Sequence, residues 1–305
     1  ANIVVINDAS GSWSGNLLPH PQGQPIQLGD MTMESNGTIH IVYKWTWLST
    51  TYFYYATNIS GSWVFKELTN TTHNSVIPTY EVLELDSQGN LHYFFRNGSS
   101  NGNGTLFHLV ENGVSTVGNS GGGSSGSSGI YNGNNTVWLA SDINPTGNGK
   151  PYWMTVLGTR LYFSGDTGGG NGTELIAYDP ANNTSWMVAD INPSGNSEPR
   201  HMFALGTRLY FTADDGTNGR ELWAYEETND TAWMVADIDP SGDGGPTGIV
   251  TIGTRLYFNP TDGTNGRELW AYEETNDTAW MVNDTDSGPG NGNWGHLVAL
   301  GTRVY

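Results

Sequence analysis

The chain has 305 residues, with 11 Lys and Arg against 30 Asp and Glu, and its formal net charge is −19. A polyanion of this kind repels phosphate backbones and anionic lipid surfaces, so we expect no nucleic-acid partner. The absence of Cys excludes a disulfide framework, a thiolate metal site and a cysteine nucleophile. No apolar run reaches the ~20 residues that a membrane-spanning helix needs, so we expect no membrane insertion.

The composition predicts an all-β fold, because 42 Gly and 12 Trp indicate many tight turns between aromatic strands. The first predicted elements are two strands within residues 2–18, joined by a polar turn before Trp13. Residues 24–70 and 75–120 each contain a glycine turn that leads into an aromatic strand. We expect these two segments to form one four-stranded antiparallel unit each.

A Gly/Ser low-complexity stretch follows at 120–129, within a segment (120–145) that we interpret as an insertion. Residues 129–131 and 136–139 then predict a hairpin. This hairpin is either part of the insertion or the remnant of a degenerate unit.

Three further units, within 149–287, repeat with a period of about 47 residues. Glu-Leu-Trp-Ala-Tyr occurs at 221–225 and 268–272, and Glu-Leu-Ile-Ala-Tyr occurs at 174–178. In the last unit, apolar runs and turn residues predict strands at 248–252, 255–258, 268–272 and 279–282. Four short antiparallel strands in ~47 residues is the period of a β-propeller blade.

The two ends of the chain each supply half of such a unit. Residues 294–305 contain its first two strands and residues 1–20 its last two. A propeller hides its edge strands by closing its ring, so we expect residues 2–6 to pair with 303–305 in a shared closing blade. The predicted fold is a single β-propeller domain over 1–305 with six blades, or with seven if the hairpin at 129–139 belongs to a degenerate blade.

The repeated motifs carry a family resemblance. Glu-Leu-Trp, Gly-Thr-Arg-Leu-Tyr-Phe and Asp-Ile-Asp-Pro-Ser-Gly (237–242) resemble the ELWxxDGT repeat proteins of bacteria and archaea over residues ~130–305. The N-terminal part resembles sialidase-like (BNR-type) propeller repeats more loosely, through Gly-Asn-Leu-His (89–92) and Ala-Thr-Asn-Ile-Ser-Gly-Ser-Trp (56–63). Both resemblances imply a propeller on a secreted or cell-surface protein.

Oxygen-bearing side chains gather in the turns between the second and third strands of the repeats. Carboxylate and amide oxygens are the ligands that Ca²⁺ prefers, although Asp, Asn and Gly also form ordinary turns. The predicted calcium ligands, as an alternative to plain turns, are Asp166, Asp214, Asp215, Asn218, Asp262 and Asn265.

The chain contains 12 Asn-x-Ser/Thr sequons, and many of them fall in turns between the last two strands of a unit. Such turns are open enough for a glycan, whereas a turn copied by duplication would give the same pattern. The predicted glycosylation sites are Asn58, Asn182, Asn183, Asn229, Asn276, Asn36 and Asn134.

No catalytic residues can be assigned from the sequence. Arg96, Arg200 and Trp153 escape the repeat pattern, whereas His40 and His92 occupy equivalent positions and are expected to be structural. We therefore expect a non-enzymatic adhesion, binding or surface-assembly module, with carbohydrate, other surface proteins or its own copies as partners. The alternative is a carbohydrate-active protein, either a lectin or a sialidase-like glycosidase.

Overall fold

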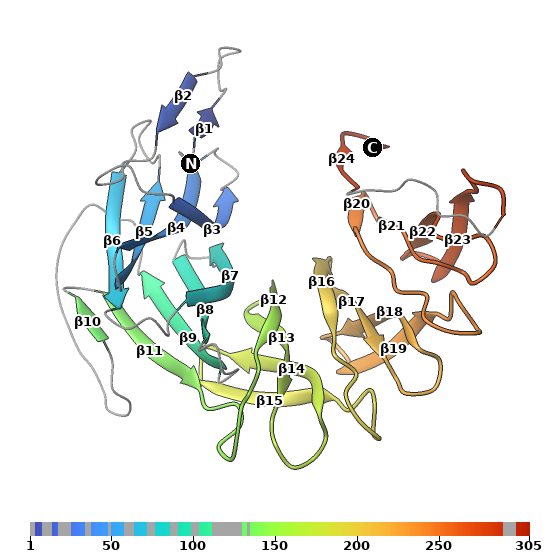
Figure 1. Ribbon diagram of the computed structural model, residues 1–305, viewed down its shortest axis with the longest axis horizontal. Coiled ribbons are helices and arrows are strands. Elements are labelled where there is room, and N and C mark those ends of the chain that lie inside the picture. Colours follow the sequence, from blue (N-terminus) through green and yellow to red (C-terminus); the bar gives the residue numbers. More distant parts are fainter. Residues whose placement is uncertain are drawn as a thin grey trace. The chain divides into compact units, whose positions relative to one another are not determined.

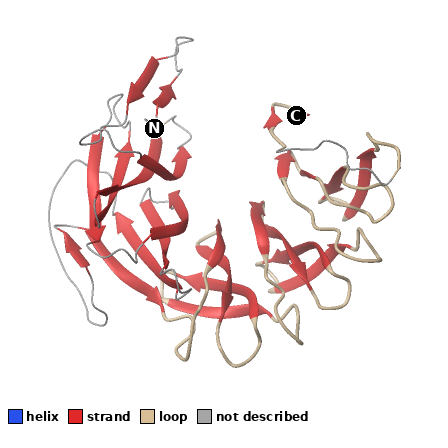
Figure 2. Ribbon diagram, viewed as in Figure 1, coloured by secondary structure: helices blue, strands red, loops and turns tan. Residues whose placement is uncertain are grey.

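The computed structural model describes residues 4–7, 14–17, 26–33, 38–47, 50–57, 64–71, 77–85, 91–98, 104–111, 130–132, 135–288 and 297–305. Every regular element among them is a β-strand, which confirms the all-β class (Figures 1 and 2). Within these ranges no helix has the length and hydropathy to cross a membrane. The chain divides into two compact units, residues 1–142 and 143–305.

The first unit begins with a two-stranded hairpin, β1 (Val4–Asn7) and β2 (Ser14–Leu17). A four-stranded antiparallel sheet in the order β3-β4-β5-β6 follows. Its strands are β3 (Ile26–Met33), β4 (Ile39–Trp47), β5 (Thr50–Thr57) and β6 (Val64–Thr71). This sheet matches the first predicted four-stranded unit.

The second sheet of this unit differs from the predicted one. Residues 75–120 contain three strands of it, β7 (Ile77–Leu85), β8 (Leu91–Gly98) and β9 (Gly104–Glu111). The next strand is β11 (Asn135–Ser141), which pairs with β9, and β10 (Ile130–Asn132) adds a fifth strand beyond it. The hairpin predicted after the Gly/Ser stretch therefore completes this sheet, because β11 satisfies the backbone groups along the edge of β9.

Histidines and aromatic side chains form the interior of this unit. His40 is buried, and its Nδ1 lies 2.6 Å from the hydroxyl of Tyr55. His92 Nδ1 lies 2.9 Å from His108 Nε2. Burial, together with the neighbouring His92, lowers the pKa of His108 to about 3, so this imidazole is neutral. His40 and His92 thus lie within packed, hydrogen-bonded aromatic layers.

The second unit contains three four-stranded antiparallel sheets, one for each predicted repeat. The first repeat comprises β12 (Tyr152–Leu157), β13 (Arg160–Asp166), β14 (Thr173–Asp179) and β15 (Thr184–Ala189). The second comprises β16 (Arg200–Leu205), β17 (Arg208–Asp214), β18 (Arg220–Glu226) and β19 (Thr231–Ala236). The third comprises β20 (Val250–Ile252), β21 (Arg255–Phe258), β22 (Leu269–Glu273) and β23 (Thr278–Asn283). The hairpin of β24 (Ala299–Leu300) and β25 (Arg303–Val304) follows.

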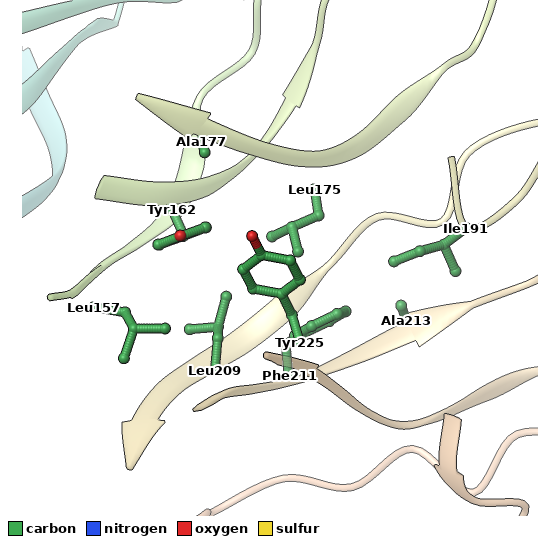
Figure 3. Packing of buried hydrophobic residues seen from close by; sticks show 9 residues of the cluster. All are labelled: Leu157, Tyr162, Leu175, Ala177, Ile191, Leu209, Phe211, Ala213 and Tyr225. Carbon is green, nitrogen blue, oxygen red and sulfur yellow. The ribbon is translucent and has the colours of Figure 1, made fainter. Parts of the chain in front are cut away.

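Apolar side chains from neighbouring repeats pack against one another in this unit. Tyr162 and Leu175 of the first repeat and Phe211 and Tyr225 of the second are buried in one cluster. Figure 3 shows the ring of Tyr225 projecting into the middle of this cluster. The sheets are therefore stacked face to face, and each supplies one wall of a core shared with the next repeat.

A buried glutamate fixes the connection from each repeat to the next. Glu221 has no exposed surface, and its carboxylate accepts hydrogen bonds from the backbone amides of Ile238 (2.9 Å) and Gly244 (2.7 Å). Glu174 makes the same bonds to Ile191 and Ser197, each at 2.9 Å. The Glu of the Glu-Leu-Trp motif thus holds the crossover against its own sheet, which is a structural role.

Candidate functional site

The candidate calcium ligands lie in the turns between the second and third strands, where they close hydrogen-bonded turns. Asp215 Oδ1 accepts from the amides of Thr217 (2.8 Å) and Asn218 (2.7 Å), and its Oδ2 accepts from Asn218 Nδ2 (2.7 Å). Asp262 makes the same three bonds with Thr264 and Asn265. These are the contacts by which Asp favours a turn.

The other two candidates behave alike. Asp166 Oδ1 accepts from the Gly168 amide (2.8 Å), and Asp214 Oδ1 accepts from the Gly216 amide (2.7 Å). Burial tends to raise the pKa of Asp215, but the hydrogen bonds from Asn218 and Thr217 outweigh it and lower the pKa. Across the described ranges, no three His, Asp or Glu side chains converge in a group that could hold a metal. Calcium binding by these turns stays a prediction.

Four of the predicted glycosylation sites lie on described turns, and all four are exposed. Asn229 Oδ1 accepts from the Thr231 hydroxyl, and Asn276 Oδ1 accepts from the Thr278 hydroxyl. Asn182 makes the same contact with Thr184, whereas Asn183 has a φ of 56° and accepts from the Tyr178 hydroxyl. Asn36, Asn58 and Asn134 lie outside the described residues.

A different set of side chains distinguishes the repeats from one another. It lies where β12 and β16, the first strands of the first two repeats, begin. We call Trp153, Glu198, Arg200, His201 and Arg220 the strand-start cluster. The sequence singles out Trp153 and Arg200 as non-repeating, and the structure brings both into this cluster together with His201.

The backbone of the strand-start cluster adopts a conformation that favours glycine. Trp153 and His201 have φ angles of 54° and 52°, and Gly248 occupies the equivalent position in the third repeat with a φ of 63°. The pairing register of both strands shifts at this point, between Tyr152 and Thr155 and between Arg200 and Phe203. A bulky residue in this region of φ costs about 1–3 kcal/mol, and such residues concentrate at functional sites.

Charged groups surround the histidine of the cluster. Arg200 Nη2 contacts Glu198 Oε2, and Arg220 Nη2 lies 3.5 Å from the same oxygen. Arg220 also donates to the backbone carbonyl of Glu198 at 2.8 Å, which ties β18 to the start of β16. The Arg200 side chain remains 43% exposed, so a ligand can reach its guanidinium.

His201 is the least satisfied member of the cluster. Its ring lies 4.7 Å from that of Trp153, between centroids, and its buried Nδ1 has no hydrogen-bond partner among the residues that the structure describes. Burial, and then the positive charges of Arg200 and Arg220, lower the pKa of His201. The cluster thus offers a neutral imidazole, a guanidinium and an indole face where the two bulged strands β12 and β16 begin. The sequence alone does not single out His201. The only signal is that one position of the repeat is occupied by Trp153, His201 and Gly248 in turn, three residues of different chemistry.

The comparisons with known proteins relate this chain to others by fold. No protein-family model matches the chain, and no curated protein matches it by sequence. Among solved structures, a puromycin hydrolase matches with a TM-score of 0.59 and 11% identity, covering 96% of this chain and 43% of that one. A solved structure from a study of two prolyl endopeptidases matches with a TM-score of 0.54 and 14% identity. The match covers 96% of this chain and 40% of the endopeptidase chain.

A puromycin-hydrolyzing peptidase from Mycobacterium tuberculosis also matches, with a TM-score of 0.54 and 9% identity. The match covers 87% of this chain and 38% of the peptidase. The chain therefore spans about two fifths of the length of these structural neighbours. At such low identity the likeness shows the fold alone.

These neighbours contradict the function that the sequence predicts. We expected a non-enzymatic adhesion, binding or surface-assembly module, or else a carbohydrate-active protein, whereas the neighbours are puromycin hydrolases, a puromycin-hydrolyzing peptidase and prolyl endopeptidases. The expectation was wrong because repeat motifs report how sheets are built and stacked, and the same stacked sheets serve many functions. The resemblance to ELWxxDGT and sialidase-like repeats stays a prediction.

Proposed function

We propose that this chain is the β-propeller domain of a peptidase and that its strand-start cluster contacts the peptide substrate. The observation that carries the proposal is the fold likeness to a puromycin hydrolase over 96% of this chain and 43% of that one. Under this proposal the remaining part of the enzyme supplies the catalytic groups.

The stacked sheets are the blades of the proposed propeller. Two sheets lie in the first unit and three in the second, and the hairpins β1–β2 and β24–β25 each contribute two strands more. The ring has six blades if these hairpins share one blade, and seven if each belongs to its own. With either count the first strand of each repeat would lie nearest the central channel, which is the route we propose for the substrate.

The strand-start cluster fits a peptide because it combines apolar and polar contacts. The exposed guanidinium of Arg200 can donate to a peptide carbonyl, and the Trp153 ring can pack against an apolar side chain. Binding energy from such remote contacts holds the substrate in place for the reacting groups elsewhere.

The experiment compares variants of the gene product that contains this chain, using fluorogenic peptide amides. Trp153→Ala and Arg200→Ala should each raise KM about tenfold with little change in kcat, because they remove contacts made equally in the ground and transition states. Lys150→Ala is the matched control, since Lys150 lies two residues before β12, also has a positive φ (42°) and forms an exposed ion pair with Asp166.

Two results would contradict the proposal. A gene product that hydrolyses no peptide amide would remove the peptidase assignment. Full activity with an unchanged KM in both cluster variants would remove the role of the strand-start cluster and leave the peptidase assignment in place.

A further inference from the structure

The same two contacts, an Arg–Glu pair and a Tyr–Tyr pair, join neighbouring repeats at both junctions of the second unit. Arg160, the first residue of β13, lies 3.1 Å (Nη1) from Glu227 Oε1 in the next repeat, and the Tyr162 hydroxyl donates to the same oxygen at 3.2 Å. The ring centroids of Tyr162 and Tyr225 are 5.4 Å apart. The second strand of one repeat thus meets the hairpin formed by the third and fourth strands of the next.

The junction between the second and third repeats uses equivalent residues. Arg208 Nε lies 3.7 Å from Glu274 Oε1. The rings of Tyr210 and Tyr272 lie 5.6 Å apart, between centroids. Both Tyr162 and Tyr210 have no exposed surface at these junctions. A Glu and a Tyr on the incoming hairpin are therefore the partners that each repeat receives.

In the third repeat the equivalent side chains, Arg255 and Tyr257, are more exposed to solvent. Arg255 pairs at 2.7 Å with Glu273 of its own repeat, and its side chain is 51% exposed, against 33% for Arg160 and 26% for Arg208. Tyr257 is partly exposed, unlike Tyr162 and Tyr210. Within the described ranges, no carboxylate of a following repeat approaches Arg255.

The apolar part of this face is uncovered in the same way. Trp280 and Val282 are 38% and 44% exposed. Their counterparts Trp186 and Val188 in the first repeat pack into the core shared with the second repeat. Exposed apolar surface with a charged rim marks an interaction site. At the other two junctions the element that covers this face carries the Glu and the Tyr, and among the described residues no such element covers it here.

The hairpin β24–β25 provides only half of the next sheet. It is a two-stranded sheet, and by its Gly-Thr-Arg sequence β25 corresponds to β13, β17 and β21, each of which pairs with a third strand. Leu300 and Tyr305 of this hairpin are 70% and 61% exposed. Among the described residues no third strand pairs with β25, and its edge can accept a strand through backbone hydrogen bonds.

We infer that the edge of β25 and the face formed by Arg255, Tyr257 and Trp280 bind a β-hairpin of the Glu-Leu-Trp type. The hairpin pairs its first strand with β25, stacks a Tyr against Tyr257 and places a Glu beside Arg255. Residues 267–283 of this chain are the template for such a hairpin, with Tyr272 and Glu274 in the required positions. This inference does not depend on the proposed peptidase function.

The N-terminal hairpin is the competing occupant, because the sequence predicts that residues 2–6 pair with 303–305. When the ends of the strands are aligned, this hairpin carries Asp8 at the position of Glu227 and Glu274, and it carries Ile6 at the position of Tyr225 and Tyr272. The tyrosine that recurs at both observed junctions is missing from it. The chemistry of the face therefore favours a Glu-Leu-Trp-type hairpin.

The test adds a fluorescent peptide with the sequence of residues 267–283 to the full chain and measures anisotropy. We expect saturable binding that weakens about fivefold when the peptide carries Glu274→Ala or the chain carries Arg255→Ala. The matched control is Arg160→Ala in the chain, because Arg160 already has its Glu partner and its loss should leave peptide binding unchanged.

A second measurement uses a covalently attached hairpin, because an isolated two-stranded hairpin is only marginally stable in water. A copy of residues 258–283 is fused after Tyr305, and its melting temperature is compared with that of the same fusion carrying Glu274→Ala in the added copy. The inference predicts a higher melting temperature for the unaltered fusion. Equal melting temperatures, or binding only after residues 1–18 are deleted, would overturn it, and the latter result would assign the face to the N-terminal hairpin.

Discussion

Arg160 Nη1 and Glu227 Oε1 lie 3.1 Å apart and join two successive repeats across a sequence separation of 67 residues. Arg160 also lies over the ring of Trp186, with its Cζ 5.3 Å from the ring centroid. The guanidinium thus connects the outermost strand of its own sheet to the hairpin of the next. Arg208 repeats the arrangement with Trp233 and Glu274.

This pair predicts a measurable coupling between repeats. Arg160→Ala and Glu227→Ala should each destabilise the chain, and a double-mutant cycle should give a coupling free energy of about 0.5–1 kcal/mol, because both groups are partly exposed. The coupling should fall as salt is raised from 0.01 M to 1 M. Chemical denaturation of the four proteins measures it, and a coupling of zero at low salt would contradict a stabilising role for the pair.

The buried glutamates predict a pH dependence of stability. Burial raises the pKa of the Glu221 carboxyl from 4.5 to about 7, although the amides of Ile238 and Gly244 donate to it. Because the folded state holds this proton more tightly than the unfolded chain, the contribution is fully present below pH 4.5 and is lost as pH rises to about 7. The loss is on the order of 3 kcal/mol.

Glu221→Gln should therefore flatten the dependence of the melting temperature on pH between 4.5 and 7. Glu226→Gln is a control of opposite sign. Burial acts to raise the pKa of Glu226, but the hydrogen bond from Arg208 outweighs it, so its contribution is lost as pH falls. If the melting temperature of Glu221→Gln changes with pH between 4.5 and 7 as steeply as that of the parent chain, the buried carboxyl does not cause the pH dependence.

Two glycines with similar backbone angles should respond differently to a side chain. Gly263 has a φ of 73°, and a Cβ there would lie 2.4 Å from Asp239 Oδ1 of the preceding crossover. Gly253 has a φ of 63° with no atom within 4 Å of such a Cβ. We expect Gly253→Ala to cost about 1 kcal/mol of unfolding free energy from backbone strain alone, and Gly263→Ala to cost about 1–3 kcal/mol more. Equal losses in urea unfolding would show that the crossover does not pack against this turn as described.

The exposed sequons predict glycans on Asn229 and Asn276 in protein from its native source, which we propose is secreted or displayed on the cell surface. Asn182 should be modified in preference to Asn183, because the latter has a left-handed φ and accepts a hydrogen bond from Tyr178. Peptide mass spectrometry of the native protein checks this, and unmodified Asn229 and Asn276 peptides would refute it.

The repeat strands could be predicted closely because local sequence determines them. The strand predicted at 255–258 coincides with β21, since Gly253 and Thr254 form the turn before it and Arg-Leu-Tyr-Phe has high β propensity. The place of β11 beside β9 could not be predicted, because the pairing joins segments on either side of a long Gly/Ser stretch. The bulge at Trp153 and His201 could not be predicted either, because local propensity disfavours a positive φ in bulky residues. Only the comparison of equivalent positions, with Gly248 in the third repeat, points to it.

The most direct test of the proposed function uses the native protein. An antibody raised against this chain captures the protein from its source, and the captured material is assayed for release of fluorophore from peptide amides, with an unrelated antibody as control. If this chain is the propeller domain of a peptidase, peptide hydrolysis will coincide with the captured polypeptide through size-exclusion chromatography. Captured polypeptide that elutes without any peptide hydrolysis would contradict it.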